Sequence, residues 1–544
     1  MSSINSMGVA DPRKRRYLLP ERILWQQGVK NAEALLDGGE DTCELRYDGD
    51  TAPAILLDYG REIHGGVQIW NTIRSPHQPI SVRVRFGESA VEAMREPNQD
   101  HAIHDDVLKV PWYGYQEFGN TGFRFVRIEL VNPGDKLVLK ALRAVFLYRD
   151  LEYKGSFRCS DERLNTIWDT GAYTTHLCMQ DMVWDGIKRD RLVWIGDIHP
   201  ETMVINTVFG AAEVLPQSLD YVRDTTPLPG WMNGISSYSL WWLRVHKCWY
   251  LYHGDLDYLQ AQRTYMLGLL RLLLEQIGDD NREKMGGHRF LDWPSSEDPT
   301  AIHAGLHALL TLTLEDGAWL CDVLGESAMA DASRAGAARL RQYTPPVSHT
   351  KQANALLALA GLRDAKEINA TELAKDPLAG VSTFYGYYVL EARAMADDHE
   401  GALHVIRNYW GAMLDLGATT FWEDFNLEWT KDGAPIDALV PEGKKSIHAD
   451  YGNYCYKGLR HSLCHGWASG PTAWMTEHVL GLRPLEPGCR KLLVEPHLAD
   501  LDWAEGTFPT PEGIVKVRHT KTGTGEVKTD ISAPDGIEIV WTED

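Results

Sequence analysis

Alternation of hydrophobic and polar residues predicts strands in the first part of the chain. Residues 81–86 and 123–130 alternate with a period of two, and a turn signal, Asn132-Pro133-Gly134-Asp135, introduces a further run at 136–140. Such alternation, punctuated by Gly, Pro and Asn, is typical of antiparallel sheets. We therefore predict an N-terminal antiparallel β-sandwich domain over residues 1–154, in which the Gly-rich stretch 58–66 forms a hairpin turn.

After residue 155 the hydrophobic positions recur with the period of a helix. The helical segments include 161–182, 265–277, 302–323, 352–362, 381–397 and 401–416. Roughly a dozen segments of such length, joined by short loops, fit helical hairpins that close into a ring. The chain shows no repeated unit of a solenoid, and no GxGxxG follows a strand as a dinucleotide fold requires. We predict an all-α domain over residues 155–480.

Short strand patterns return after residue 481. They cover residues 491–494, 514–519, 527–531 and 537–541, with Gly and Pro-Asp-Gly turns between them. We predict a C-terminal β-sandwich domain over residues 481–544. So short a tail buries too little surface to be stable alone, and we expect it to pack on the helical domain.

Composition and charge narrow the classes of partner. The formal net charge is −22 at pH 7, so we expect neither nucleic acid nor an anionic membrane surface as a partner. The basic run at residues 13–16 is short and is interpreted as a solvated tail. No apolar run suits a signal peptide or a membrane span. Nineteen tryptophans are a high count, which fits a protein that stacks on carbohydrate.

The cysteines and histidines give no metal or redox motif. The eight cysteines are far apart and form no CxxC pair, so neither a zinc site nor a dithiol is indicated. We predict reduced thiols and a cytoplasmic location, and assign no metal and no cofactor. His303 and His307 have the i, i+4 spacing of metal ligands, but no further ligand pattern surrounds them, and structural histidines are the better interpretation.

A charged loop between two helical segments is the strongest candidate site. It holds three cations, the carboxylates Asp185, Asp190 and Asp197, and the tryptophans Trp184 and Trp194. Carboxylates held close together and beside arginines are typical of acid–base sites. Tryptophan beside carboxylate also suits a sugar, with stacking on the apolar face and hydrogen bonds to the hydroxyls. The alternative is a solvated salt-bridge loop that caps a helix, and the density of acids and tryptophans favours a site.

Three later residues are further candidates. Glu423 lies among aromatic side chains, including Trp422, and such surroundings raise the pKa of a carboxyl group. The alternative there is an acidic helix N-terminus capped by a threonine. His465 precedes a glycine and a tryptophan, although a lone histidine is more often structural. Trp293, in Phe-Leu-Asp-Trp, is a weaker candidate for lining a sugar pocket.

Taken together, these motifs resemble the family 78 α-L-rhamnosidases. The family signature D-x-x-x-R-[ED]-x-x-x-W-x-x-D is matched by Asp185, Arg189, Asp190, Trp194 and Asp197. The sequence TTFWE at 419–423 resembles the T-T-x-W-E motif of the family, and SLCH at 462–465 resembles its S-x-x-H motif. Residues 153–161 and 480–488 resemble the starts of its catalytic and C-terminal domains. The order and spacing of the motifs make the resemblance specific.

The resemblance implies an (α/α)6 barrel as the catalytic domain, flanked by β-sandwich domains, and an inverting hydrolase. Asp190 would be the general acid and Glu423 the general base, with carboxyl groups about 6.5–9.5 Å apart to admit a water molecule. The residues that we predict to bind the substrate are Asp185, Arg189, Trp194, Asp197, Trp293, Trp422 and His465. Many members have Cys-Pro after the first aspartate and glutamate as the acid, where this chain has Gly186-Ile187 and the shorter Asp190.

Three functions stay open on the sequence. The first is an exo-acting α-L-rhamnosidase, whose partner is a rhamnose-containing glycoside or oligosaccharide. The second is a lyase that eliminates rhamnose from a 4-linked uronate, since Lys188, Arg189 and Arg191 would neutralise the uronate carboxylate. The third is a carbohydrate-binding protein without catalysis, suggested by the unusual Asp190. The oligomeric state is also open, with a homodimer as one option.

Overall fold

The computed structural model describes residues 10–72, 77–96 and 102–541, which form two compact units. The first unit runs to Asp150 and also contains His176–Leu192 and Met413–His465. The second consists of Leu151–Thr175, Val193–Ala412 and the chain from Gly466 onward. Each unit is built from segments far apart in the sequence. The predicted domains, by contrast, follow the chain in order, and their bounds stay predictions.

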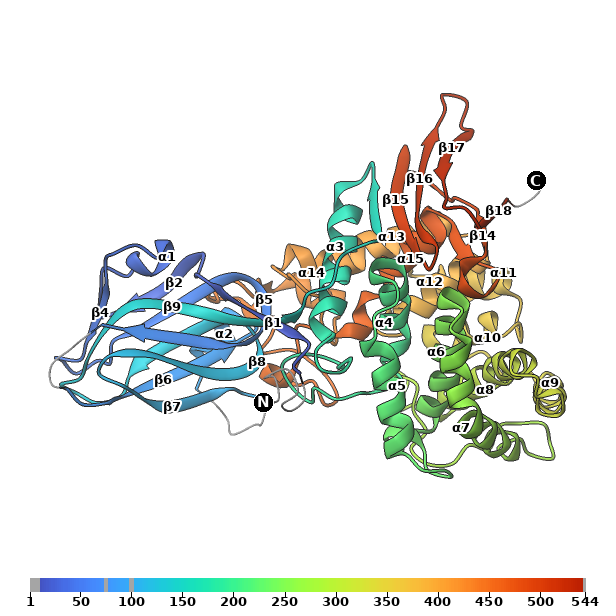
Figure 1. The fold of residues 1–544 in the computed structure, drawn as a ribbon, viewed down its shortest axis with the longest axis horizontal. Coiled ribbons are helices and arrows are strands. Elements are labelled where there is room, and N and C mark those ends of the chain that lie inside the picture. The colour runs from blue at the N-terminus through green and yellow to red at the C-terminus, as the bar shows by residue number, and fades with distance from the viewer. Residues whose placement is uncertain (1–9, 73–76, 97–101, 542–544) are drawn as a thin grey trace, which may run out of the picture. The chain divides into compact units, whose positions relative to one another are not determined.

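The N-terminal part of the first unit is an antiparallel sheet domain, in agreement with its alternating pattern (Figure 1). The strands are β1 (Arg13–Leu18), β2 (Arg22–Gln27), β3 (Val29–Lys30), β4 (Cys43–Arg46), β5 (Ala54–Asn71), β6 (Ile80–Gly87), β7 (Asp105–Val110), β8 (Gly114–Leu130) and β9 (Lys136–Arg149). Their order is β3-β4-β9-β5-β8-β6-β7, with β1 beside β9 and β2 beside β5. Two short helices, α1 (Ala34–Asp37) and α2 (Ala90–Met94), join strands. Inward side chains such as Leu57, Val84 and Ile128 form the core.

Two predictions for this domain are wrong. Residues 58–66 form no hairpin turn, because they lie inside the 18-residue strand β5. Gly60 and Gly65 have positive φ angles of 83° and 142°, and the register against β8 shifts near both, so these glycines serve bulges. The basic residues 13–16 are no free tail, because β1 pairs along its length with β9.

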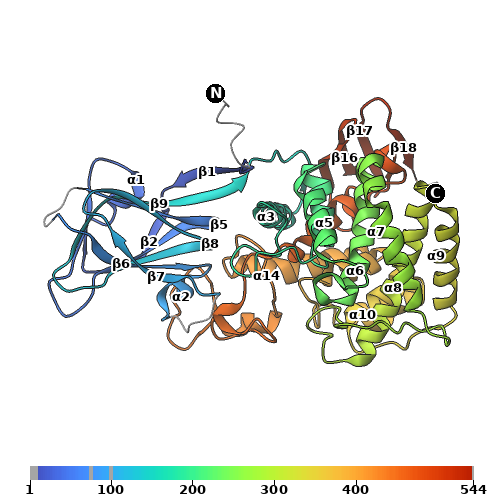
Figure 2. The same cartoon turned by 60° about the horizontal axis from the view of Figure 1, so that its bottom comes forward.

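The middle of the second unit is helical. Each predicted segment is helical over most of its length, but the helix predicted at 265–277 begins nine residues earlier, at Leu256. The helices are α3 (Glu162–Cys178), α4 (Ile198–Val204), η2 (Ile205–Phe209), α5 (Val214–Thr225), η3 (Met232–Gly234), α6 (Ser236–His253), α7 (Leu256–Glu275), α8 (Pro299–Val323), α9 (Ser327–Leu340), α10 (Lys351–Leu359), α11 (Ala365–Ile368), η4 (Asn369–Leu373), α12 (Gly386–Met395), α13 (His399–Val405), η5 (Ile406–Trp410) and α14 (Gly411–Asp415). Helices α6, α7, α8 and α9 pack side by side (Figure 2). The helical hairpins that the sequence predicts are therefore present.

The end of the chain forms two small sheets on this helical part. The elements are η8 (Gly466–Ser469), α15 (Gly470–Trp474), η9 (Met475–Val479), β13 (Leu482–Pro484), η10 (Pro487–Cys489), β14 (Lys491–Val494), β15 (Trp503–Thr510), β16 (Gly513–Lys521), β17 (Val527–Ser532) and β18 (Glu538–Trp541). One sheet has the order β10-β15-β16-β17, where β10 is Ser156–Cys159, and the other has the order β13-β14-β18. The Cys489 thiol lies 3.3 Å from the carbonyl oxygen of Tyr252 in α6, so the tail packs on the helices as predicted.

Two further observations concern the whole described chain. All eight cysteines lie within it as free thiols, and most are buried. None of the helices in the described ranges combines the length and hydrophobicity that crossing a bilayer requires.

Candidate active site

Three segments of the first unit lie side by side and carry the main predicted residues. They are the loops 185–192, 420–424 and 461–465. The amide of His465 donates to the carbonyl oxygen of Phe421 (2.9 Å), and the amide of Glu423 donates to that of Ser462 (3.0 Å). The chain around Glu423 is therefore a loop anchored to its neighbour, and the helix-cap alternative is wrong.

The first loop approaches the third closely because of a glycine. Gly186 and His465 form a backbone bridge. A Cβ atom on Gly186 would lie 2.8 Å from the carbonyl oxygen of Cys464, closer than real Cβ contacts allow. This close contact between the two backbones therefore requires glycine at position 186.

The loop 185–192 is closed at its base and strained at its tip. The amide of Asp185 donates to the carbonyl oxygen of Leu192 (3.0 Å), and the amide of Leu192 donates to Oδ1 of Asp185 (2.9 Å). At the tip, Asp190 and Arg191 both have φ of 54°, a left-handed conformation that is uncommon for residues with side chains. Such strain is often found at functional sites. The side chain of Asp190 at this tip is partly exposed, at 28%.

Glu423 is a buried carboxylate held by two donors. Its side chain is 4% exposed, and it forms an ion pair with the guanidinium of Arg189. Its other oxygen accepts a hydrogen bond from the amide of Ser462 (3.1 Å). Burial raises the pKa of Glu423 above its ordinary value, while Arg189 opposes this shift. The group is therefore a stronger base than an exposed glutamate and is still stabilised as the anion.

The same guanidinium also reaches Asp190. Nη1 of Arg189 lies 3.2 Å from Oδ2 of Asp190, while its Nη2 contacts Glu423. Two hydrogen bonds and the width of one guanidinium keep the two carboxylates within about 8 Å of each other. Arg189 is fixed in turn by a bond from Nε to the carbonyl oxygen of Arg460 (3.0 Å) and by the ring of Tyr456, 5.8 Å away.

The imidazole of His465 lies close to the carboxylates of both Glu423 and Asp185. Its Nε2 is 3.5 Å from Oε1 of Glu423 and 3.8 Å from Oδ2 of Asp185. Burial, aided by the charge of Arg189, holds the pKa of His465 well below its ordinary value. A neutral imidazole beside two carboxylates offers both a donor and an acceptor, which suits sugar hydroxyls.

A buried ion cluster behind the site was not found from the sequence. The Lys188 side chain is 1% exposed, and its ammonium lies 2.7 Å from Glu92 and 3.8 Å from Glu88. It also donates to the carbonyl oxygens of Leu459 and His461. Burial raises the pKa of Glu88 to about 8. Lys188 thus ties the candidate loop to α2 and to the start of the segment 461–465.

This cluster has the ligand types of a metal site, but the lysine supplies the positive charge. Ligand atoms of Glu88, Glu92 and His448 lie within 4.8 Å of one another. Nζ of Lys188 is 3.4 Å from Nε2 of His448, so an ammonium already occupies this position. The sequence signal that was missed is Ser89-x-x-Glu92, the pattern of a capping box. In the structure, the hydroxyl of Ser89 accepts a hydrogen bond from the amide of Glu92 (3.1 Å), and the carboxylate of Glu92 accepts one from the amide of Glu88 (2.8 Å).

Three of the predicted residues belong to the second unit. Asp197 is buried and accepts a hydrogen bond from the hydroxyl of Tyr238 (2.7 Å). The ring of Tyr238 contacts Trp194 at 6.1 Å and Phe290 at 6.5 Å, and Phe290 contacts Trp293 at 5.1 Å. These rings form a continuous aromatic chain beside one carboxylate, the combination that suits sugar.

Trp422 takes a different place from the other tryptophans. Its side chain is fully buried and meets Phe425 edge to face at 5.6 Å. In this position it supports the loop that carries Glu423. Direct stacking of Trp422 on a sugar stays a prediction.

Comparison with known proteins agrees with this fold. The model of the bacterial α-L-rhamnosidase six-hairpin glycosidase domain matches residues 152–344, and that of the bacterial α-L-rhamnosidase C-terminal domain matches residues 481–540. The two matches follow each other along the chain in the order of the predicted helical and C-terminal domains. The predicted resemblance to the family 78 α-L-rhamnosidases is thereby confirmed.

Individual relatives cover the chain to different extents. An α-L-rhamnosidase of Alteromonas sp. (strain LOR) is 31% identical over 117 residues, which are 21% of this chain and 10% of that protein. The crystal structure of a GH78 rhamnosidase of Bacillus sp. GL1 has a TM-score of 0.78 at 23% identity, over 94% of this chain and 55% of that one. A rhamnosidase from Klebsiella oxytoca with rhamnose bound has a TM-score of 0.68 at 19% identity, over 86% and 96%. The chain thus spans about half of the length of the Bacillus GH78 rhamnosidase, and the structural likeness concerns the fold.

Proposed function

We propose that this chain is an exo-acting α-L-rhamnosidase that releases terminal rhamnose from a glycoside or oligosaccharide with inversion of configuration. The observation that carries the proposal is the pair of carboxylates, Asp190 and Glu423, that share the guanidinium of Arg189. One is buried with a raised pKa and the other is partly exposed. An inverting glycosidase needs two carboxyl groups that flank the scissile bond, one as acid and one as base.

In the proposed mechanism, Glu423 is the general base. It takes a proton from a water molecule, which attacks the anomeric carbon. The raised pKa of Glu423 brings its basicity nearer to the working pH, which favours proton transfer. Asp190 is the general acid, and its exposure at the loop tip suits protonation of a leaving oxygen. Asp185, Arg189 and His465 bind rhamnose hydroxyls.

The remaining residues that the sequence predicts to bind the substrate have that role in this proposal too. Trp194, Asp197, Trp293 and Trp422 bind or support the sugar. The helical hairpins close into an (α/α)6 barrel, and the sheet domains are β-sandwiches, as in the family. Elimination from a uronate is less well supported, since Lys188 and Arg189 already pair with carboxylates and Arg191 donates to the carbonyl oxygen of Asn120.

Release of rhamnose from α-L-rhamnosides tests the activity. We expect Glu423→Gln to lower kcat by about 10²–10⁴-fold, the usual contribution of a general base. Glu477→Gln is the matched control, because Glu477 is also buried, with a pKa raised to about 7 by burial. Undiminished release by Glu423→Gln would contradict the proposal.

The anomer first formed tests the stereochemistry. Proton NMR at early times should show β-L-rhamnose, because inversion converts the α linkage to a β product. First appearance of the α anomer would overturn inversion, while an unsaturated product absorbing in the ultraviolet would identify a lyase.

A further inference from the structure

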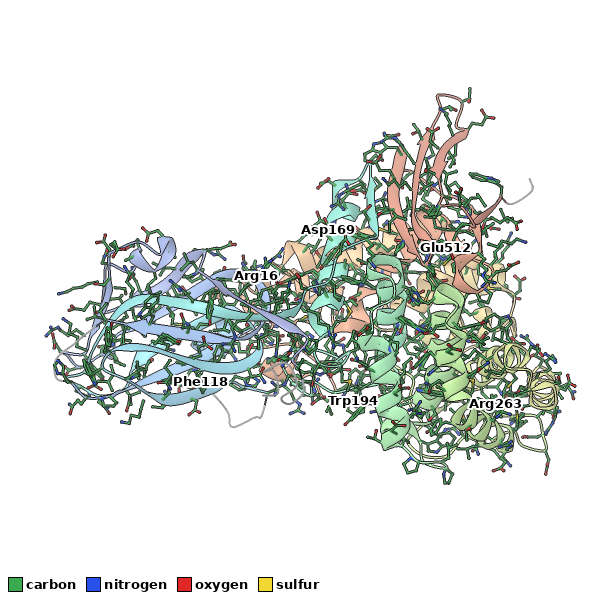
Figure 3. All side chains as sticks on the ribbon, viewed as in Figure 1. Arg16, Phe118, Asp169, Trp194, Arg263 and Glu512 are labelled. Carbon is green, nitrogen blue, oxygen red and sulfur yellow. The ribbon has the colours of Figure 1, made fainter. Side chains whose placement is uncertain are left out.

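Within the first unit, strands of the N-terminal sheet hold two of the three site loops by hydrogen bonds. Strand β8 also carries Phe118 (Figure 3), and the amide of its Gly122 donates to the carbonyl oxygen of Ile187 in the first loop (2.7 Å). The amide of Glu62 in β5 donates to the hydroxyl of Thr419 (2.9 Å), just before the second loop. The sheet therefore contributes to the framework that fixes these loops.

The third loop is held by a buried glutamate, Glu88, that lies between β6 and α2. Its Oε2 accepts a hydrogen bond from the amide of Leu463 (2.6 Å). The residue before this one, Ser462, donates its own amide to Oε2 of Glu423 (3.1 Å), and its carbonyl oxygen accepts from the amide of Glu423 (3.0 Å). Glu88 is thus one peptide unit away from the group that holds the proposed base.

The hydrogen-bond geometry around Ser462 favours a proton on Glu88. The hydroxyl oxygen of Ser462 lies 3.1 Å from the carbonyl oxygen of Cys464 and 3.4 Å from Oε1 of Glu88. A hydroxyl group has one proton to donate, and a carbonyl oxygen can only accept. When Ser462 donates to the nearer carbonyl oxygen, its contact with Glu88 is a hydrogen bond only if the carboxyl group of Glu88 is the donor. Neutral Glu88 therefore satisfies both contacts at once.

Charge balance in this buried region gives the same result. Glu62, Glu88 and Glu92 are at most 2% exposed, and the charge of one buried ammonium, Lys188, acts on all three. Lys188 lies nearer to Glu92 (2.7 Å) than to Glu88 (3.8 Å). The neighbouring His448 is neutral, because burial holds its pKa well below its ordinary value. Since burial raises the pKa of Glu88 to about 8, the one cation balances Glu92 and Glu88 stays neutral near neutral pH.

We infer that Glu88, in its neutral form, is a positioning residue for the proposed base: it holds the segment 462–463 so that the amide of Ser462 stays directed at Glu423. The inference rests on the proposed function, which makes Glu423 the base. It deepens that function, because it makes the N-terminal sheet domain part of the catalytic apparatus. The side chain of Glu88 is fully buried, so it acts through this segment and not on the sugar.

Two substitutions of Glu88 separate its hydrogen bonds from its charge. Glu88→Gln keeps an acceptor for the amide of Leu463 and a donor for the hydroxyl of Ser462, so kcat on p-nitrophenyl α-L-rhamnoside should stay close to that of the unmodified chain. Glu88→Ala removes both hydrogen bonds and should lower kcat by about 10–100-fold, the cost of a misplaced catalytic group. KM should not change in either variant, because no residue that binds the sugar is removed.

The pH profile gives a readout that a general loss of packing would not move. Burial raises the pKa of Glu423, and the charge of Arg189 and the hydrogen bond from the amide of Ser462 oppose this. If Glu88→Ala releases that amide, the pKa of Glu423 should rise, and the acidic limb of kcat/KM should shift to higher pH. Glu88→Gln should leave the limb in place. Glu477→Gln, at a buried glutamate of the second unit, is the control and should change neither kcat nor the limb.

Three results would overturn the inference. Unchanged kcat and an unmoved limb in Glu88→Ala would show that the segment does not need Glu88. A limb at lower pH in Glu88→Gln would show that Glu88 acts on Glu423 as a charge. A loss confined to KM would assign Glu88 to substrate binding. If Glu88→Ala does not fold, Ser462→Ala removes only the hydroxyl between Glu88 and Cys464; a lower kcat with a raised limb would support the inference, and no change would overturn it.

Failure of the proposed function would be seen separately. If the unmodified chain released rhamnose from no substrate, that function would fail, while the contact between Glu88 and the segment 462–463 could still be tested. NMR titration of isotope-labelled glutamate carboxyl groups would then measure the pKa of Glu423, whose signal is assigned by its loss in Glu423→Gln. A higher pKa of Glu423 in Glu88→Ala would support the inference, and an equal pKa would overturn it.

Discussion

Arg189 and Glu423, 234 positions apart in the sequence, form a buried ion pair at the candidate active site. The same guanidinium bonds Asp190, so one arginine contacts both proposed catalytic carboxylates. Because Arg189 is itself fixed by main chain and by an aromatic ring, the arrangement does not depend on a mobile side chain.

Removal of Arg189 should move the pH profile. Burial raises the pKa of Glu423 and Arg189 opposes this, so Arg189→Met should raise that pKa further. A base must be ionised, and the acidic limb of kcat/KM against pH should therefore shift to higher pH. Arg189→Lys keeps the charge and should shift the limb less. An unmoved limb in Arg189→Met would argue that Glu423 is not the base.

Asp190→Asn should show the signature of a lost general acid. We expect about 10²–10⁴-fold lower kcat/KM on a rhamnosyl disaccharide, whose leaving oxygen needs a proton. The loss on p-nitrophenyl α-L-rhamnoside should be much smaller, since nitrophenolate leaves without protonation. Comparison of the two rates within one variant corrects for any general damage. Equal losses on both substrates would assign Asp190 a binding role.

Lys188→Met should lower the free energy of unfolding by about 3–5 kcal/mol, because it leaves the buried carboxylate of Glu92 without the cation that lies 2.7 Å from it. Denaturant unfolding measures this. The double variant Lys188→Met, Glu92→Gln should recover part of the loss, since it removes this unpaired charge. A single variant as stable as the unmodified protein would show that the cluster contributes little.

His246 should contribute to the loss of stability in acid. Burial lowers the pKa of His246 from 6.5 to about 4, so its contribution is present above pH 6.5 and is lost as the pH falls towards 4. Linkage gives a change of about 3 kcal/mol over this window. His246→Gln should therefore flatten the dependence of unfolding free energy on pH between 6.5 and 4. His404→Gln, at an exposed site on α13, should leave that slope unchanged.

Part of the fold and of the site followed from local patterns. Alternation placed the strands around Val84 and Ile128, and helical periodicity placed α7, α8 and α10, because both periods report which side chains face a core. The motifs around Asp185, Glu423 and His465 could be recognised because acids, tryptophans and glycines stand there at fixed spacing. Each of these signals lies within a few residues of chain.

Long-range contact decided the rest. The residues 58–66 look like a turn, yet they stay extended, because strands some 60 residues further along pair with them and absorb the glycines as bulges. The pairing of β1 with β9 spans more than a hundred residues and has no local signal. A β-bulge, or a pairing between strands that are far apart in the chain, leaves no signal within a short stretch of sequence.

The sequence by itself determined which elements form and which side chains could carry acid–base chemistry. Only the tertiary structure decided that Arg189 contacts both Asp190 and Glu423. It also decided that Lys188 pairs with two buried glutamates and that Asn120 lies beside the tip of the loop 185–192. The physical reason is that charge pairing and burial depend on distance in space. Residues that are hundreds of positions apart become neighbours only after the strands and loops have packed.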